Sequence, residues 1–549
     1  MSLRSSVLLI VTVCAVTFCA GLGTTALWEP DEPRFAEATR QMLLRGDFIT
    51  PWFNDRPRFE KPVLLYWLQV PFFALLGDTE TAVRLPSVLT GLLAVVAIFG
   101  IGRDLVSPRA GLLGALCLAT TFRFVLYARQ GLTDVPVTAA VAAGLWAMTR
   151  ALSGGSAAAA RLAWACAGAA ILLKGPVGLL APVIWTGWAW LRGGRQEVAR
   201  TCPLSGVLIA TAVAAPWFIV MLLLHGRAFF DVAIGYEVVA RYVSEDFPGR
   251  DRGFFYFWGV WLGDGLPWSL FLVAAFWWRY GRKRELAPGE ATALQLAGLW
   301  FLTVLLLFSV SQYKLPHYIL PAYPAMALAV GVFVNAAIER RAAAALWRAP
   351  AYLTAVVLAV GAALTWLLMA RAFELRPGDP SFVLPVLLAA GALLIGIVAS
   401  PFVGSRPLLT FAAIAATLAV CFGTLGTFIA TRELRRFQPI PPLAAAARQT
   451  VADHEPLAVA GNFGAPGLVF YARHPVRQLT DTDDLISYLS QPGRRHCVLP
   501  QSELEAVRPL INRPMRIQAE ASIFSVRMRR LLESEPERAG RVLMLVTVE

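Results

Sequence analysis

The chain has 549 residues, of which 57% are hydrophobic and only 15% are charged, so it is far more apolar than a soluble domain of this size requires. The formal net charge of +13 does not indicate a nucleic-acid-binding protein, because the basic residues lie in short clusters between apolar runs instead of on one basic face. Its seven cysteines show no CxxC or Cys/His zinc spacing, so neither a disulfide framework nor a structural metal is indicated.

The apolar runs predict a polytopic α-helical membrane protein with about thirteen transmembrane helices. The first run, within residues 1–27, is interpreted as a retained span and not as a cleaved signal peptide, because a charged motif follows it at once. The candidate spans lie near residues 7–27, 82–102, 110–127, 133–150, 162–174, 176–192, 204–224, 256–278, 292–310, 315–336, 351–370, 382–400 and 408–430.

The distribution of arginine and lysine predicts the orientation of these spans. With a cytoplasmic N-terminus, the loops on the cytoplasmic side carry most of the basic residues, for example Arg103, Arg109 and the cluster at 279–284. The odd number of spans then places the C-terminal region on the outer side of the membrane.

Two outer segments, 28–81 and 225–255, are too long to be simple connections. They mix charges, aromatics and prolines, a composition typical of amphipathic helices at the membrane interface. After Arg432 the chain becomes polar, and short apolar runs alternate with helical patterns. We therefore expect a transmembrane domain over 1–430 and a small outer α/β domain over 431–549.

Charged motifs recur at the outer ends of the predicted spans, and this is the most informative feature of the sequence. Such groups are costly inside a membrane and usually mark a functional site, so we expect them to converge on one outer cavity. The motifs are DEPR at 31–34, RFEKP at 58–62, ARQGLTD at 128–134, LLKGP at 172–176, YEVVARY at 236–242 and QYKLPHY at 312–318.

These residue types suit chemistry on a phosphorylated sugar. Carboxylates can hold a nucleophile, a metal or sugar hydroxyls, and cations can neutralise phosphate charge. Each residue also has a structural interpretation: Asp31 and Asp134 can cap helices, Lys174 can reach the interface along its alkyl chain, and His317 is better explained as a satisfied polar group than as a metal ligand.

The stretch DEPRFAEATRQMLLRGDFITPWFNDRPRFEKPVLLYWLQ resembles the first outer loop of the GT-C glycosyltransferases that use polyprenyl-phosphate sugars. Among them it is most similar to the aminoarabinose lipid A transferases, the ArnT group. The likeness continues through ARQGLTDVPVT, LLKGPVGLLAP, RGFFYFWGVWLGDGLPW and YKLPHYILPAYPAMAL, so it covers about the first 335 residues.

The resemblance implies a GT-C fold with thirteen spans and a periplasmic C-terminal domain, in the inner membrane of a bacterium. It implies that the active site faces the periplasm and transfers 4-amino-4-deoxy-L-arabinose from undecaprenyl phosphate to lipid A. By the family's DEPR and EKP motifs, the catalytic residues are expected to be Asp31, Glu60 and Lys61. The expected substrate-binding residues are Arg34, Arg58, Asp134, Lys174, Glu237, Arg241, Lys314 and Tyr318.

The resemblance leaves a metal requirement open and implies no organic cofactor. In the aminoarabinose group a Glu-His pair in the second outer loop is associated with a metal, but here Glu237 is followed by Val238. A divalent metal would need a differently built site, for which Glu60 is the best candidate ligand.

Three alternatives remain open from the sequence. A related transferase could move mannose, galacturonic acid or arabinose to a protein, glycan or lipid acceptor. A transporter of lipid-linked sugars would also need charges within the membrane, although no inverted repeat of broken helices is evident. A membrane scaffold would explain the C-terminal domain but not the converging charges.

Overall fold

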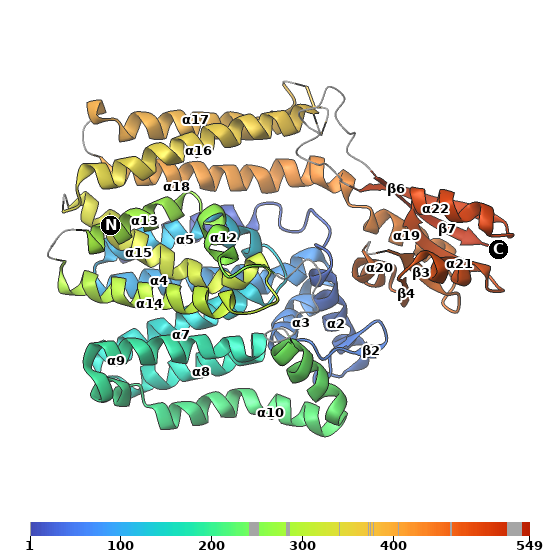
Figure 1. The fold of residues 1–549 in the computed structure, drawn as a ribbon, viewed down its shortest axis with the longest axis horizontal. Coiled ribbons are helices and arrows are strands. Elements are labelled where there is room, and N and C mark those ends of the chain that lie inside the picture. Colours follow the sequence, from blue (N-terminus) through green and yellow to red (C-terminus); the bar gives the residue numbers. More distant parts are fainter. Residues whose placement is uncertain are drawn as a thin grey trace.

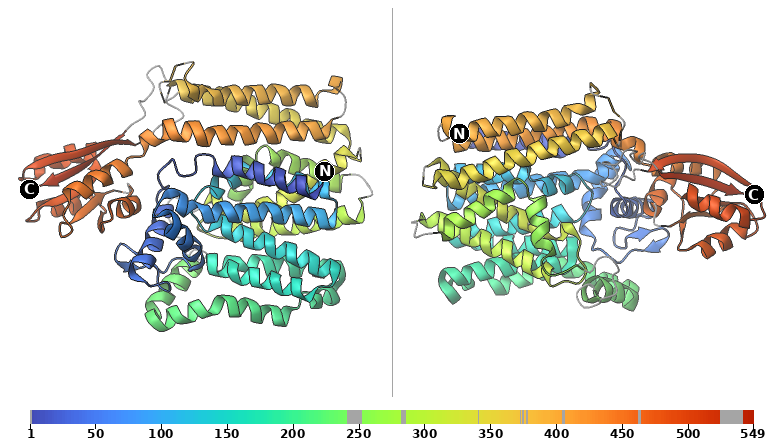
Figure 2. Two further views of the ribbon diagram at one scale, coloured as in Figure 1. Left: turned by 180° about the vertical axis from the view of Figure 1, so that it is seen from behind. Right: turned by 45° about the horizontal axis from the view of Figure 1, so that its top comes forward.

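The long helices form a bundle, and a smaller domain of helices and strands lies at one end of it (Figure 1). The computed structural model describes residues 2–240, 252–281, 286–339, 341–371, 373, 375, 376, 378–403, 406–461, 464–523 and 541–549. The N-terminus lies at the end of the bundle remote from the smaller domain, as the further views also show (Figure 2).

Within these described ranges, nine helices are long and apolar enough to cross a membrane, or up to eleven if each bent pair is one span. The fold is therefore that of a multi-pass helical membrane protein. The bundle contains α1 (Leu3–Cys14) with η1 (Ala15–Cys19), α4 (Glu80–Leu105), α5 (Pro108–Ala119), α6 (Phe122–Ala128), α7 (Asp134–Gly154), α8 (Ala157–Lys174), α9 (Leu180–Arg200), α10 (Pro203–Phe230), α12 (Tyr256–Asp264), α13 (Trp268–Tyr280), α14 (Pro288–Ser309), η4 (Pro316–Ala322) with α15 (Tyr323–Ile338), α16 (Ala344–Arg371), α17 (Val383–Ala399) and α18 (Pro407–Thr424).

Each predicted span coincides with one of these helices or with a bent pair. The run at 110–127 forms α5 and α6, which meet at 68°, and the run at 256–278 forms α12 and α13, which meet at 110°. By length and composition, residues Ala157–Arg200 count as one span and the apolar helix Leu3–Cys19 falls short of one. The exact number of thirteen therefore stays a prediction.

Helix α15 lies at the centre of the bundle. All of the most apolar 18-residue stretch of Pro316–Ile338 is buried, whereas only 22% of the corresponding stretches in the segments that contain α10 and α16 is buried. Close packing of α15 on α5 requires glycine, since a Cβ atom on Gly331 would lie 2.5 Å from the backbone nitrogen of Gly114. The exposed apolar faces of α10 and α16 are suited to contact with lipid.

The first predicted outer segment lies at the end of the bundle that carries the smaller domain (Figure 1). It contains α2 (Asp31–Arg45), a short hairpin of β1 (Trp52–Phe53) and β2 (Arg56–Pro57), and the apolar helix α3 (Leu64–Leu76). The second outer segment continues α10 as the π-helical η3 (Asp231–Ala240).

The C-terminal domain is a five-stranded mixed sheet with strand order β4-β3-β5-β7-β6. Strand β3 pairs in parallel with β4 and β5, and β7 is antiparallel to β5 and β6. Helices α19 and α20 pack on one face, and α21 and α22 pack on the other. The bounds are α19 (Ile440–Thr450), β3 (Leu457–Ala460), α20 (Ala465–Ala472), β4 (Val476–Leu479), α21 (Thr482–Ser490), β5 (Arg495–Pro500), α22 (Gln501–Val507), β6 (Met515–Ile523) and β7 (Arg541–Val548).

Candidate active site

The two carboxylates that begin α2 have different environments. Both Asp31 and Glu32 lie in the first turn, where the partial positive charge of the helix N-terminus favours acidic residues. Neighbouring residues on a helix point in different directions, and here Glu32 is fully buried whereas the Asp31 side chain is about half exposed. Only Asp31 is therefore available to a substrate.

Glu32 anchors the start of α2. Its carboxylate accepts hydrogen bonds from Arg84 Nε at 3.1 Å and Nη2 at 3.0 Å, and from the backbone N–H groups of Gly131 at 2.6 Å and Trp28 at 2.7 Å. Arg84 also donates to the carbonyl groups of Leu22, Thr25 and Ala26. This buried network joins α2 to α4 and to the loop before α7, so it fixes the direction in which Asp31 points.

Asp31 borders a cavity of about 890 Å³ at the outer-segment end of the bundle. Its wall is built from the first outer segment, from the ends of α6, α7 and α8, from η3 and η4, and from the C-terminal domain. The lining includes Glu29, Asp31, Arg34, Arg58, Glu60, Lys61, Tyr127, Thr133, Asp134, Lys174, Tyr236, Glu237, Tyr313, His317, Tyr318, Gly464, Ala465, Pro466 and Gln478. Residues from all six charged motifs thus border one cavity, as the sequence predicts.

Two lysines in the cavity wall are held by carboxylates from other elements. Lys61 pairs with Glu237 of η3, and Lys174 pairs with Asp134 at the start of α7. Gly175, with φ +61°, ends α8 directly after Lys174, so the ammonium group lies at the helix end. Because an ammonium group has three donors, either lysine can hold its carboxylate and still donate to a phosphate.

His317 and Tyr127 extend this polar cluster. Their side chains lie 3.0 Å apart between Nδ1 and Oη, and His317 Nε2 is 4.0 Å from Asp134 Oδ1. The ammonium group of Lys174 lies 5.1 Å from the centre of the Tyr318 ring, a cation–π distance. The interpretation of His317 as a satisfied polar group agrees with these contacts, although the residue also borders the cavity.

The arginines and Glu60 lie on the side of the cavity formed by the first outer segment. Arg34 Nη1 is 3.7 Å from Asp31 Oδ1, and Arg58 Nε is 3.6 Å from Glu60 Oε2. Arg58 is buried, and its guanidinium lies 4.5 Å from the centre of the Phe35 ring. The Arg34 side chain, in contrast, is 43% exposed and borders the cavity.

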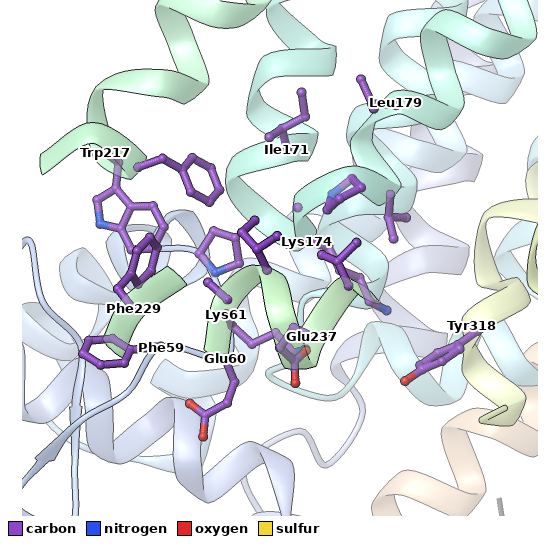
Figure 3. Close-up of a pocket in the computed structure, with 18 of the residues that line it drawn as sticks. Phe59, Glu60, Lys61, Ile171, Lys174, Leu179, Trp217, Phe229, Glu237 and Tyr318 are labelled. Atoms are coloured by element: carbon purple, nitrogen blue, oxygen red, sulfur yellow. The ribbon is translucent and has the colours of Figure 1, made fainter. Parts of the chain in front are cut away.

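An apolar pocket of about 310 Å³ adjoins the polar cavity and shares Glu60, Lys61, Lys174, Glu237 and Tyr318 with it. Its remaining wall is largely hydrophobic. Figure 3 shows Phe59, Trp217 and Phe229 grouped on one side of this pocket, with Lys61 beside Glu237. A molecule with an apolar chain and an anionic head would therefore meet both lysines where the two spaces join.

One predicted substrate-binding residue, Lys314, is not on the cavity wall, and another cannot be compared with it. Lys314 is buried, its Nζ donates to the carbonyl oxygen of Ser311, and it is absent from the lining although Tyr313 and Leu315 are part of it. The turn before η4 directs this side chain into protein. Arg241 lies outside the described residues, so its predicted role remains a prediction.

The sequence patterns missed Glu29 and the contribution of the C-terminal domain. Glu29 directly precedes the DEPR motif, and its Oε1 accepts a hydrogen bond from the backbone N–H of Gly467 at 2.7 Å. Nothing in the sequence links residues that are 438 positions apart. The buried partner of Glu32 was also missed, because Arg84 lies within an apolar run.

The surroundings of Glu60 do not form a metal site among the described residues. No group of three or more His, Cys, Asp or Glu side chains suited to a metal ion occurs in that part of the chain. Glu60 shares the walls of the two spaces with the cations Arg58 and Lys61 and with the carboxylate of Glu237, which forms an ion pair with Lys61. A metal requirement stays untested, and no step below depends on one.

Comparison with known proteins agrees with the fold and the motifs. Residues 60–220 match the family model described as dolichyl-phosphate-mannose-protein mannosyltransferase. An undecaprenyl phosphate-α-4-amino-4-deoxy-L-arabinose arabinosyl transferase of Pseudomonas aeruginosa is 31% identical over 340 residues, which are 60% of this chain and 60% of that protein. An uncharacterized protein of Aquifex aeolicus is 29% identical over 331 residues, 60% of this chain and 64% of that protein.

The chain thus aligns with less than two thirds of the length of these relatives. The structural likeness extends further: ArnT from Cupriavidus metallidurans bound to undecaprenyl phosphate superimposes with a TM-score of 0.76 at 22% identity, covering 99% of this chain and 98% of that chain. An archaeal oligosaccharyltransferase from Archaeoglobus fulgidus gives 0.54 at 12% identity, covering 91% and 69%. The chain therefore has the GT-C fold of ArnT, and in sequence it is similar to the aminoarabinose transferases, as its motifs predict.

Proposed function

We propose that the protein is a glycosyltransferase that moves 4-amino-4-deoxy-L-arabinose from undecaprenyl phosphate to a phosphate of lipid A. The observation that carries the proposal is the junction of the apolar pocket with the charged cavity at Lys61 and Lys174. The phosphate-proximal part of a polyprenyl chain would occupy the first space, and the phosphate and sugar would occupy the second. The names of the relatives support the choice of donor.

The charges suit the bond changes of such a transfer. An oxygen of the acceptor phosphate forms a bond to the anomeric carbon while the bond from that carbon to the oxygen of undecaprenyl phosphate breaks. Negative charge develops on the leaving phosphate, and the ammonium groups of Lys61 and Lys174 stabilise it more strongly in the transition state than in the ground state.

Asp31 would act on the other side of the reacting centre. An acceptor phosphate is already anionic at neutral pH and needs little deprotonation, so the carboxylate would balance positive charge on the sugar ring or orient the acceptor. Arg34, 3.7 Å from Asp31, would bind an acceptor anion next to that carboxylate. Asp31 would become a general base only for a hydroxyl acceptor.

The location supports a periplasmic active site. The cavity lies at the end of the bundle that carries the C-terminal domain (Figure 1), and the arginine-rich loops predict that the opposite end faces the cytoplasm. The enzyme would then work at the outer face of the inner membrane.

Mass spectrometry of lipid A from a bacterium with and without this chain tests the function. We expect a pentosamine on a lipid A phosphate only when the chain is present. Unmodified lipid A together with transfer to a protein or glycan would instead support a related transferase, for which the match to the mannosyltransferase model provides a reason.

Vesicles that contain the purified protein and a labelled polyprenyl-phosphate sugar separate an enzyme from a carrier. Covalent transfer to an added acceptor supports the enzyme. Movement of the labelled lipid across the bilayer without transfer would support a carrier of lipid-linked sugars.

A further inference from the structure

The C-terminal domain is fastened to the first outer segment at several points. Arg40 Nη1 donates to the carbonyl oxygen of Phe470 at 3.0 Å, and its guanidinium lies 5.3 Å from the centre of that ring. Asn54 forms two hydrogen bonds of 2.8 Å with the backbone of Val476. The hydroxyl group of Tyr471 accepts from the N–H of Leu27 at 2.9 Å and donates to Glu80. These contacts hold α20 and β4 against the segment that carries Asp31.

The same two elements form part of the cavity wall. Gly464, Ala465 and Pro466 at the start of α20, together with Gln478 of β4, border the space that Asp31 and Arg34 also border. Gln478 is exposed, and its side-chain amide donates to the carbonyl oxygen of Gly461, which restricts its orientation. A polar side chain in this position is suited to bind sugar hydroxyls or phosphate oxygens.

The C-terminal domain contacts the turn before Asp31 through the hydrogen bond between Gly467 and Glu29. Glu29 lies two residues before Asp31, and a Cβ atom on Gly467 would lie 2.0 Å from Glu29 Oε1. Only glycine allows this approach. The position of the C-terminal wall is thereby coupled to the turn that places Asp31.

The C-terminal wall and the apolar pocket have no described residue in common. The lining of the apolar pocket includes Lys61, Lys174, Glu237 and Tyr318 but no residue from the described part of the C-terminal domain. If the donor chain and its phosphate occupy that side, the head of the second substrate must approach from the side of Arg34 and Gln478. The proposed function thus assigns the two sides to different substrates.

Resting on that function, we propose that the C-terminal domain forms the acceptor-binding wall of the active site and that Gln478 is a specificity-determining residue for the acceptor. The ligand class is a lipid head that bears sugar hydroxyls and phosphate. The C-terminal domain therefore takes part in substrate binding. The contact between Glu29 and Gly467 keeps its cavity-lining residues next to Asp31.

The test measures KM for donor and acceptor separately, with the full-length purified protein, undecaprenyl-phosphate aminoarabinose and lipid A. Gln478→Ala removes one side-chain hydrogen-bonding group, so the acceptor KM is expected to rise about 3- to 10-fold while the donor KM stays within twofold of wild type. Gly467→Ala displaces Glu29 and is expected to raise the acceptor KM at least as much.

Arg477→Ala is the matched control. Arg477 is the neighbour of Gln478 on β4, it pairs with Asp484, and it does not line the cavity. Because successive side chains on a strand point to opposite faces, this variant should leave both KM values unchanged. Gln478→Asn, which keeps an amide, should restore part of the acceptor affinity.

The outcomes separate this inference from the proposed function. A wild-type protein that transfers no sugar to lipid A would contradict the function itself. A wild-type protein that transfers normally, with a Gln478→Ala variant whose acceptor KM is unchanged or whose donor KM rises equally, would overturn the acceptor role of the domain. Should Gly467→Ala fail to fold, Gln478→Ala alone decides between these results.

Discussion

Arg84 lies in an apolar run of α4, and its guanidinium holds the buried carboxylate of Glu32 by two hydrogen bonds of 3.1 and 3.0 Å. The pair also forms hydrogen bonds with backbone groups of the loop after η1 and of the loop before α7. The pair stabilises the turn at the start of α2. It thereby fixes the position of Asp31, which directly precedes Glu32 in the chain.

Removal of one partner of the Arg84–Glu32 pair should therefore lower the stability of the protein and not only its rate of sugar transfer. Glu32→Ala leaves a buried guanidinium without its carboxylate, and we expect a loss of about 3–5 kcal/mol in the free energy of unfolding. Thermal unfolding in detergent measures the effect. Arg227→Ala, which breaks an exposed ion pair with Asp231, should cost less than about 1 kcal/mol. If both variants lower the free energy of unfolding by the same amount, the Arg84–Glu32 pair does not stabilise the start of α2 as proposed.

Lys174 should contribute directly to binding of the donor phosphate. A hydrogen bond to a charged group is worth about 1.5–3 kcal/mol, so Lys174→Met is expected to weaken binding of undecaprenyl phosphate about 10- to 100-fold. Titration with undecaprenyl phosphate measures this affinity.

The loss of Lys174 also leaves Asp134 buried without its ammonium partner. The double variant Lys174→Met with Asp134→Asn removes both charges and separates the two effects. If the double variant binds undecaprenyl phosphate as tightly as wild type, Lys174 does not contact the phosphate. Arg109→Met, at the opposite end of the bundle, is the control and should bind normally.

Glu29 should make the acceptor KM depend on pH. The residue as a whole is exposed and borders the cavity, but its carboxyl group contacts the backbone of Gly467, and the loss of hydration there raises its pKa to about 7. The N–H group of Gly467 and the charge of Arg34 lower the pKa, whereas the charge of Asp31 raises it. The loss of hydration is the largest of these effects.

The sign follows from the raised pKa. Loss of hydration favours the protonated form more strongly than the hydrogen bond from the Gly467 N–H favours the ionised form. The contribution of Glu29 to domain docking is therefore complete below the ordinary carboxyl pKa and is lost as the pH rises through about 7. We expect the acceptor KM of wild type to increase between pH 6 and pH 8.5. Glu29→Gln, which cannot ionise, should show a flatter profile, and an unchanged profile would contradict the assignment.

Much of the architecture could be predicted from the sequence, because a membrane imposes simple rules. Apolar runs became helices, and the charged motifs at their outer ends met in one cavity, as Asp31, Lys61 and Asp134 show. In the C-terminal domain the runs around Leu457–Ala460, Arg495–Pro500 and Arg541–Val548 became strands, as predicted. Local composition was sufficient for these elements.

Features that depend on the direction of a side chain or on distant contacts could not be predicted. Composition did not distinguish Asp31 from Glu32, although one borders the cavity and the other is buried. Lys314, like the other predicted site residues, lies in a charged motif at the outer end of a span. Its side chain is nevertheless directed away from the cavity wall by the turn before η4. Strand β4, with the mixed sequence VRQL, gave no strand signal and yet supplies Gln478.

The most direct test of the account is transfer of labelled aminoarabinose from undecaprenyl phosphate to lipid A by purified wild-type protein and by Asp31→Asn. The substitution preserves the size of a half-exposed side chain and removes its charge, so both proteins should unfold at the same temperature. We predict transfer by wild type and at least a 1,000-fold lower rate for Asp31→Asn, as expected when about 4 kcal/mol of transition-state stabilisation is lost. Full activity of Asp31→Asn would contradict a reaction centred on this cavity.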